Sequence, residues 1–480
     1  MEESDINRNW NANKHLKRII TPLFTHSHAY VCWHASIAKG FVRRGIKHEF
    51  VVEYKFIERY LKKWGVSVFN IHNMKEEILN SLNVKREIDY LRKKYGISLN
   101  QLFYHPRHKK WSDEHRRKMA LAYLLIWEKY LLERSPDLTL ICDGSEIYYI
   151  TFNLMAERLG IPRIFYNCGN GPVPDTMILD ETSMFNKWVK RDYFKKNLTE
   201  VERKRVLEFI GRVKKDKPLI GGTVPVFSFK KIITHLEHMY DYLFSERWDY
   251  NPLERARFLN RLINIRRAQK YYSKPFFDER YLFFPLHVPL DAQIVYRASQ
   301  FFRQDRTVEV VSKSLPAGYY LYVKEHPHSK GMIPIDWLER MSKLPNVKLV
   351  PPDTNAHDLI RNAHAIVVIN SDVGWEALFY QKPVVVLAEP FYSGFGLTFD
   401  VENLNHLPQI IEDALAEKKI SKESVLSLLN AAMKSSYDCR VFRSGREFDM
   451  GKENIERIVD SILNKYHEVM AFSRFNGNRP

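Results

Sequence analysis

The chain has 480 residues, of which 45% are hydrophobic and 27% are charged. This is ordinary globular composition, without low-complexity tracts, at a length that favours two domains over one. The formal net charge of +17 indicates an anionic partner, which could be an acidic small-molecule ligand, an anionic membrane surface or a nucleic acid. Basic residues on a solvated helix face are the alternative that needs no partner.

Several classes of protein are excluded by what the sequence lacks. No apolar run approaches the length of a membrane span, and the N-terminus, MEESDINRNW, lacks the apolar core of a signal peptide. The four cysteines stand without CxxC or Cys/His spacing, which argues against a zinc site or a disulfide framework. There is no DxD-type acidic pair, P-loop, HExxH or GxSxG segment. The sequence therefore predicts a cytoplasmic protein with no metal and no cofactor.

Residues 1–182 alternate between apolar strands and helices, which predicts a Rossmann-like parallel sheet covered on both faces. Gly45 and Gly160 are expected to end two of the helices, because glycine readily adopts the left-handed conformation that closes a helix. The expected elements are a strand at 18–24, a helix at 30–43, a strand at 48–54, a charged helical stretch at 57–132, a strand at 137–142, a helix at 145–159 and a strand at 162–166.

Residues 183–277 show no clear strand and are rich in Lys, Arg, Tyr and Leu at helical spacing, which predicts a basic helical insertion. No nucleic-acid-binding motif accompanies it, so a membrane surface is the better partner for these helices. Strand and helix alternate again in residues 278–465, before a tail at 466–480. The expected strands are 281–285, 319–324, 347–350, 365–369 and 383–387. The predicted fold class is α/β, with two Rossmann-like domains facing a cleft into which the carboxyl ends of their strands point.

Charged and polar side chains follow one strand of the second domain in YVKEHPHSK, residues 322–330. Lys324 ends the strand, and His326 stands in a turn because the proline behind it disfavours helical geometry. Lys324, His326 and His328 together at a strand end suit an anionic phosphate group. The alternative for His326 is a polar loop residue without a ligand.

A second candidate segment is AIVVINSDVGWEALFY, residues 365–380, where a buried strand leads through Asn370 into a helix. Ser371 or Asp372 can cap this helix, and the free N–H groups of its first turn can bind a phosphate. Glu376 follows one turn later, within reach of ribose hydroxyls. The alternative is an ordinary capped helix on which Glu376 is solvated.

Asp291 is the third candidate, in FFPLHVPLDAQI, residues 283–294. It follows a strand and a proline turn and precedes a helix, so it can serve simply as an N-cap. A carboxylate across from a phosphate site can also deprotonate an acceptor hydroxyl or attack an anomeric carbon. Both roles stay open on the residues alone.

The loop after the last strand of the first domain, YNCGNGPVPDTMILDE at 166–181, is the fourth candidate. Its glycines permit tight turns close to a ligand, and Asn167 and Asn170 offer amide hydrogen bonds. Asp143 follows the neighbouring strand and should lie beside this loop, although it could equally cap the next helix. We expect these three residues to contact a sugar or an acceptor.

Together these segments resemble the capsule polysaccharide biosynthesis family, whose characterised members are β-Kdo transferases that use CMP-Kdo. The resemblance is carried by NGPVPDTMILDE, LHVPLDAQI, VKEHPHSKG, INSDVGWEAL, QKPVVVL and EPFYSGFGLT, and it covers about 163–181 and 281–407. It implies a GT-B-like fold, with the acceptor bound by the first domain and the nucleotide sugar by the second. It also implies a glycosyltransferase of surface polysaccharide synthesis, which transfers Kdo or a similar acidic sugar to a glycan or glycolipid with retention of configuration.

The same resemblance implies roles for individual residues. Asp291 would be the catalytic carboxylate, and His326 would bind the CMP phosphate and help it leave. The nucleotide would be lined by Lys324, Asn370, Ser371 and Glu376. The chain has His287 where the family often has Gln, and Asn167 where it tends to have Glu, so its sugar and acceptor contacts can differ. His287 joins Asp143, Asn167 and Asn170 as a candidate sugar or acceptor contact.

Two other functions stay open. A related transferase could use another donor, such as a UDP-sugar or a CDP-polyol. A non-enzymatic protein could instead bind a membrane or a nucleic acid through its basic helices. A CMP-sugar transferase accounts for the missing metal motif, because His, Lys and a helix N-terminus can stabilise the leaving phosphate.

Overall fold

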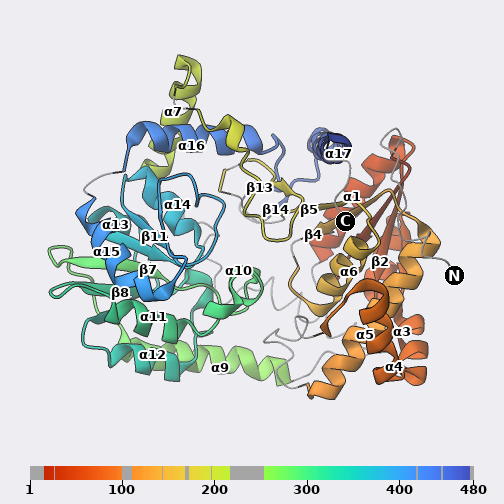
Figure 1. Cartoon of the computed structure of the whole chain (residues 1–480), viewed down its shortest axis with the longest axis horizontal. Helices are drawn as coiled ribbons and strands as arrows, with labels where there is room; N and C mark the ends of the chain where they lie inside the picture. The colour runs from red at the N-terminus through yellow and green to blue at the C-terminus, as the bar shows by residue number, and fades with distance from the viewer. Residues whose placement is uncertain are drawn as a thin grey trace. The chain divides into compact units, whose positions relative to one another are not determined.

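The computed structural model describes residues 16–25, 28–99, 111–142, 144–167, 172–173, 175–195, 197–216, 253–417, 420–444 and 447–475. The chain forms two compact units (Figure 1). The first unit combines Met1–Trp188 with Ser436–Pro480, and the second is Val189–Ser435. Each unit is built on its own sheet.

The first unit contains a sheet of six strands in the order β3-β2-β1-β4-β5-β6. The strands are β1 (Arg18–Pro22), β2 (Lys47–Val52), β3 (Ser67–Asn70), β4 (Leu138–Cys142), β5 (Arg163–Tyr166) and β6 (Leu179–Asp180). All neighbours are parallel except β5 and β6. β4 is buried along its whole length, as expected for a parallel strand with helices on both faces. The strands predicted for this unit are confirmed, with bounds that differ by one or two residues.

The helices of the first unit are α1 (His28–Arg43), α2 (Lys55–Lys63), α3 (His72–Ser81), α4 (Val84–Tyr95), α5 (Asp113–Arg134), α6 (Ile147–Arg158) and α17 (Lys452–Phe475). Local sequence sets their ends: the Ser112 hydroxyl accepts a hydrogen bond from the His115 amide (3.1 Å) at the start of α5, and Gly96 ends α4 in the left-handed conformation. The stretch 57–132, which we expected to be helical, also contains β3. β3 lies at the sheet edge with no fully buried residue, so it lacks the apolar run that marks a buried strand.

Helix α17 belongs to the first unit, although it lies at the other end of the sequence (blue in Figure 1). It follows a short antiparallel pair, β13 (Phe442–Ser444) and β14 (Glu447–Phe448), and packs against α1. Its buried apolar residues recur at helical spacing: Ile455, Ile458, Val459, Ile462, Tyr466 and Met470. The chain therefore leaves the second unit at Ser436, whereas we expected the second domain to run to 465. Spacing shows that such a helix is amphipathic but not which sheet it covers.

The second unit contains a fully parallel sheet in the order β12-β11-β10-β7-β8-β9. The strands are β7 (Tyr281–Pro285), β8 (Tyr320–Lys324), β9 (Val347–Val350), β10 (Ala365–Val368), β11 (Val384–Val386) and β12 (Phe399–Asp400). Every predicted strand of this unit is confirmed, and β12 is additional. Counted from β9, the order is third, second, first, fourth, fifth, sixth, which is the doubly wound Rossmann order. The strand order reverses between β7 and β10, and such sheets bind ligands outside the carboxyl ends of the strands at that point.

The helices of this unit are α7 (Glu200–Asp216), α9 (Leu253–Ala268), α10 (Ala292–Val295), α11 (Gln304–Lys313), α12 (Ile335–Ser342), α13 (Ala356–Asn362), α14 (Asp372–Phe379), α15 (Leu407–Ala416) and α16 (Lys422–Ser435). The short 3₁₀ turns are Arg191–Tyr193, Gln269–Tyr271, Ser299–Phe301, Pro327–Ser329 and Leu404–His406. The two parallel α/β sheets confirm the predicted fold class. That the two domains face a common cleft stays a prediction.

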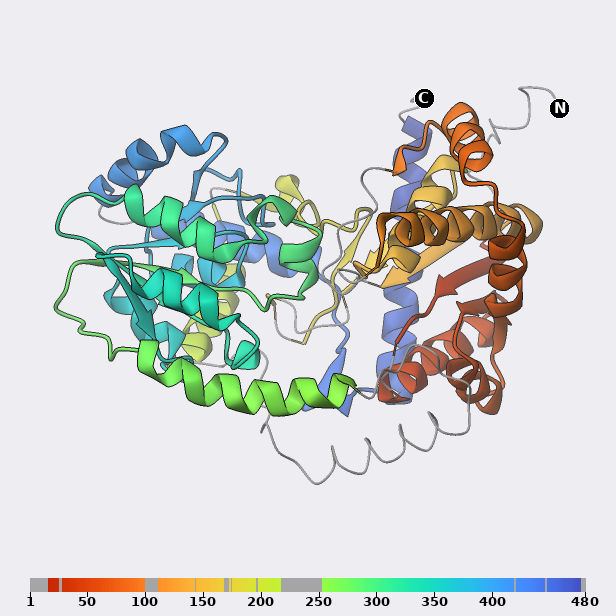
Figure 2. The ribbon, with the colours of Figure 1, turned by 90° about the horizontal axis from the view of Figure 1, so that it is seen from below.

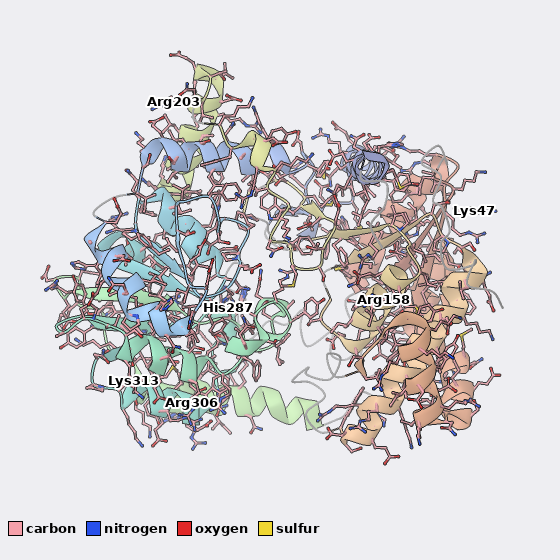
Figure 3. The ribbon with its side chains drawn as sticks, in the orientation of Figure 1. Lys47, Arg158, Arg203, His287, Arg306 and Lys313 are labelled. Carbon is pink, nitrogen blue, oxygen red and sulfur yellow. The ribbon has the colours of Figure 1, made fainter. Side chains whose placement is uncertain are left out.

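The basic segment predicted at 183–277 contributes α7 and α9 to the second unit, and residues 217–252 lie outside the described part. On α7, Arg203 (labelled in Figure 3) donates to both carboxylate oxygens of Glu423 on α16, at 2.5 and 2.6 Å. α9 packs beside α12, as the views in Figures 1 and 2 agree. The described helices of this segment are therefore docked on the second unit. Across the described ranges, we find no helix with the length and apolarity that a membrane crossing requires.

Candidate active site

Three loops leave the carboxyl edge of the second sheet side by side. β10, β7 and β8 are neighbours, with Ile366 opposite Phe283 and Pro285 opposite Lys324. The loops that follow β7 and β10 flank the switch point, where a doubly wound sheet binds its ligand, and the loop after β8 is the next one along the same edge. This edge carries the following predicted site residues: His287, Asp291, Lys324, His326, Asn370, Ser371 and Glu376.

Lys324 ends β8 with its ammonium group buried. The residue is 4% exposed, and its Nζ donates one long hydrogen bond (3.3 Å) to the carbonyl oxygen of Glu325. It forms no ion pair with a carboxylate of the described residues. Burial lowers its pKa to about 8, and the negative charges of Asp353 and Glu325 oppose that shift. A buried cation without a direct counter-ion is costly, and an anionic ligand would compensate for it.

His326 caps the 3₁₀ turn Pro327–Ser329. Its Nδ1 accepts a hydrogen bond from the His328 amide (3.1 Å), and the amide and hydroxyl of Ser329 both donate to the His326 carbonyl oxygen (2.8 Å each). Burial lowers the pKa of His326 to about 4, and the charges of His328 and Lys324 add to the effect. The ring is therefore neutral at pH 7. Because Nδ1 accepts, the ring hydrogen is on Nε2, which can donate to a ligand oxygen.

Asp291 lies on the loop after β7 and is exposed. It caps the short helix α10: its Oδ1 accepts from the Gln293 amide (2.8 Å), and its own amide donates to the Val288 carbonyl oxygen (3.0 Å). The predicted N-cap is thus confirmed. One carboxylate oxygen orients the side chain through this cap, and the other forms no hydrogen bond with the described residues. The cap therefore does not exclude a chemical role.

His287, four residues before Asp291, is labelled in Figure 3. The buried side chain of Gln304 holds its backbone by accepting from the His287 amide (2.7 Å) and donating to its carbonyl oxygen (3.2 Å). Burial lowers the pKa of His287 to about 4, and the nearby Asp291 carboxylate opposes this. Its buried Nε2 has no hydrogen-bond partner among the described residues. A buried polar atom left without a partner points to a ligand or a bound water.

The loop after β10 is tied to α10 by Asn370, whose Nδ2 donates to the carbonyl oxygen (3.1 Å) and to the side-chain oxygen (3.2 Å) of Gln293. Asn370 is 6% exposed, and its Oδ1 lacks a hydrogen-bond partner in the described structure. Ser371 caps α14 by accepting from the Val373 amide (3.2 Å), as predicted. Gly374 allows the Tyr392 hydroxyl to reach the Ser371 carbonyl oxygen (2.5 Å), because a Cβ at position 374 would collide with that hydroxyl.

Two acidic side chains one turn apart on α14 share this edge. Glu376 is 6% exposed, and its Oε2 lies 4.0 Å from Nε2 of His357 on α13. Burial and the nearby Asp372 raise its pKa to about 8, while Lys324 opposes the shift. Burial and the charge of Asp291 raise the pKa of Asp372 to about 6, and Arg297 opposes that. Glu376 is therefore protonated at pH 7 and can donate a hydrogen bond, which contradicts the alternative of a solvated glutamate.

The predicted residues of the first unit are placed less completely. Asn167 follows β5, and its amide donates to the Ile178 carbonyl oxygen (3.1 Å). Asp143 and Asn170 lie outside the described residues. Sequence reasoning missed Glu325 and His357. The Lys-Glu-His order of the turn could have indicated Glu325, whereas His357 is brought to Glu376 only by the packing of α13 on α14.

The edge as a whole suits a phosphate-bearing ligand and a reaction at a carbon nearby. It combines a buried ammonium group, a neutral imidazole that can donate, the N-terminus of α14 and an exposed carboxylate. The first three can neutralise or bind a phosphate, and the last can act as nucleophile or base. No group of three or more potential metal ligands occurs within the described ranges.

The chain is similar in sequence to known proteins. Residues 232–434 match a family model described as capsule polysaccharide biosynthesis protein. The chain is 34% identical over 129 residues to the capsule polysaccharide export protein KpsS of Escherichia coli, covering 25% of this chain and 33% of KpsS. It is 29% identical over 80 residues to the capsule polysaccharide modification protein LipA of Neisseria meningitidis, covering 17% of this chain and 11% of LipA. The matches thus span a third or less of these relatives.

A solved structure of the β-Kdo 2,7 transferase KpsC of Thermosulfurimonas dismutans aligns with 94% of this chain and 99% of its own, at a TM-score of 0.41 and 14% identity. The match to the family model lies wholly within the second unit and includes β7, β8 and β10 with the loops that follow them. Over residues 232–434, the chain is therefore similar to the capsule polysaccharide biosynthesis family.

Proposed function

We propose that this protein is a glycosyltransferase of capsule polysaccharide synthesis that takes Kdo, or a similar acidic sugar, from a CMP-activated donor. Lys324 is the observation that carries the proposal: it is a buried ammonium group without a direct counter-ion, at the carboxyl edge of a Rossmann sheet on the strand next to the switch point. Such a site favours an anionic ligand, and the phosphate of a nucleotide sugar meets that need. The match to the capsule polysaccharide biosynthesis model supports a role in capsule synthesis, and the choice of sugar follows the motif resemblance described under the sequence.

The phosphate would lie between Lys324, His326 and the N-terminus of α14. His326 donates from Nε2, and Ser371 fixes the first turn of α14 so that its backbone N–H groups face the ligand. Asn370 and the protonated Glu376 then hydrogen-bond to the ribose or the base. As the bond from the sugar to the phosphate breaks, negative charge grows on the phosphate, and these fixed donors stabilise it without metal.

Asp291 would act on the sugar itself. Its carboxylate is exposed, held by the α10 cap, and close enough to influence the pKa values of His287 and Asp372. A nucleophilic carboxylate forms a covalent sugar adduct while CMP leaves, and the acceptor hydroxyl then displaces the carboxylate, which gives net retention. His287 would contact the sugar through its unpartnered Nε2. In the first domain, Asp143, Asn167 and Asn170 would contact the glycan or glycolipid acceptor.

The acceptor class implies work on the cytoplasmic side of a membrane, with the basic helices near anionic lipid. Two alternatives to a CMP-sugar transferase stay open. A related transferase could use a UDP-sugar or a CDP-polyol, because a phosphate site alone does not select the base. A non-enzymatic role in export is the second, since KpsS carries that description, but the buried polar atoms at the switch point favour a ligand site.

Thermal-shift measurements with CMP, CDP, UDP and GDP test the proposal. A ligand that binds only the folded state raises Tm by mass action. We expect CMP or CDP to raise Tm more than UDP or GDP, and the increase to persist in EDTA. UDP binding that depends on a divalent metal would contradict the CMP donor, and no shift with any of the four would contradict a nucleotide-sugar site.

A further inference from the structure

Arg261 on α9 contacts residues 326–332, which we call the His326 turn, although it lies far from them in sequence. Its Nε donates to the Lys330 carbonyl oxygen (2.7 Å), and its Nη2 donates to the His328 carbonyl oxygen (2.7 Å). Both acceptors lie at the C-terminal end of the 3₁₀ turn Pro327–Ser329, where helical carbonyl groups lack partners within the helix. A cation there also complements the partial negative charge of those carbonyls.

The backbone of α9 itself touches the turn at Gly331. This residue has a φ of 71°, and a Cβ added to it would collide with the Arg261 carbonyl oxygen and approach the Ile265 side chain. Asn264 donates from Nδ2 to the Gly331 carbonyl oxygen (3.4 Å). Glycine is required here for conformation and for space, so the turn and α9 fit as one packed unit.

A second contact comes from Tyr272, just after the 3₁₀ turn Gln269–Tyr271. Its hydroxyl donates to the carboxylate of Glu325, which stands between Lys324 and His326 in the chain. Glu325 is 2% exposed, and burial raises its pKa to about 7. Its Oε2 has no hydrogen-bond partner among the described residues, so Tyr272 is the side chain that fixes this carboxyl group.

We propose that Arg261, with Tyr272, positions the His326 turn for the phosphate and thereby sets nucleotide affinity without touching the nucleotide. This inference rests on the proposed function of the His326 turn. It gives α9, which the sequence predicted only as part of a basic insertion, a role within the active site. Both hydrogen bonds of Arg261 end on backbone carbonyl groups of the turn. Arg261 would therefore act by holding the turn in place, and not by direct attraction between its charge and the phosphate.

CMP affinity, measured by isothermal titration calorimetry on the full chain, tests the inference. Arg261→Gln removes the two-pronged contact, and we expect Kd to rise about tenfold, since hydrogen bonds from a charged group are the strong ones. Arg261→Lys keeps the positive charge but cannot make both hydrogen bonds, so its Kd should lie between those of the wild type and Arg261→Gln. Arg266→Gln is the matched control: it removes the same charge from an exposed position on the same helix and should leave Kd unchanged. Tyr272→Phe should weaken binding less than Arg261→Gln.

A double-mutant cycle separates positioning from direct binding. If Arg261 acts through the His326 turn, Arg261→Gln should have little further effect on Kd in a His326→Ala background. Additive losses, or normal affinity of Arg261→Gln beside weakened His326→Ala, would overturn the inference while leaving the proposed function intact. Normal affinity of His326→Ala would instead contradict the proposed phosphate site, and the positioning role with it.

Hydrogen exchange provides a readout that needs no ligand. The amides of Ser329 and Met332 donate within the turn, to the carbonyl oxygens of His326 (2.8 Å) and Ser329 (2.7 Å). In Arg261→Gln these amides should exchange about tenfold faster than in Arg266→Gln, because the turn opens more often once its clamp is gone. Equal rates in the two variants would overturn the positioning role.

Discussion

Glu376→Gln should stabilise the protein at neutral pH and not at acidic pH. Burial and the nearby Asp372 raise the pKa of Glu376 from 4.5 to about 8. Between these values the folded protein holds a proton that the unfolded chain has lost, so this residue's contribution to stability is complete below pH 4.5 and is lost as pH rises toward 8. Glutamine keeps the shape of the protonated side chain and does not titrate.

The size of the effect follows from the width of that window. One pKa unit corresponds to about 1.4 kcal/mol, so the cost of keeping Glu376 protonated at pH 7 is on the order of 3 kcal/mol. The variant's advantage should therefore grow by about 1 kcal/mol per pH unit between pH 5 and pH 8.

Urea denaturation of both proteins at pH 5, 6, 7 and 8, followed by circular dichroism, measures this difference. Glu412→Gln on α15 is the control, because Glu412 is exposed and its replacement should shift stability equally little at every pH. An advantage of Glu376→Gln that does not change with pH would refute the assignment of a buried, protonated glutamate.

Two further predictions concern binding. His326→Ala should weaken CMP binding about tenfold with little loss of fold, since a turn residue carries little packing; unfolding with unchanged affinity would make His326 structural. The pKa of His326 is about 4 without a ligand, and a bound phosphate should raise it, so CMP binding should take up protons. CMP affinity should therefore increase as the pH falls from 7 to 5.5, and this increase should be larger in the wild type than in His326→Ala. Binding to vesicles of anionic lipid should fade as salt rises and should weaken when the exposed α7 residues Lys204 and Arg205 are changed to Gln. Tight DNA binding at physiological salt without vesicle binding would contradict the membrane partner.

The sequence predicts best the strands that consist of consecutive apolar residues. β7 matches the predicted bounds because a parallel strand covered on both faces is a continuous run of buried residues. β3 was missed because it is an edge strand with no fully buried residue. The return of α17 to the first unit could not be predicted, since its apolar stripe would fit either sheet.

Some features of the candidate site could also be predicted from the sequence, and others could not. Candidate residues at strand ends were predictable because the carboxyl ends of parallel strands meet at one edge. The burial of Lys324 and Glu376 depends on tertiary packing, and so do the contacts of Arg261 and Tyr272 with the His326 turn. Those features decide the electrostatics of the site, and none of them follows from local spacing.

The central claim is that Asp291 performs chemistry on a CMP-activated sugar, and Asp291→Asn tests it most directly. Asparagine caps a helix nearly as well as aspartate, so stability should change by less than about 0.5 kcal/mol and CMP affinity should hold. Sugar transfer from CMP-Kdo should fall at least about a thousandfold, because the variant keeps the shape and loses the carboxylate. Transfer at a near-normal rate by a folded, CMP-binding Asp291→Asn protein would contradict the account.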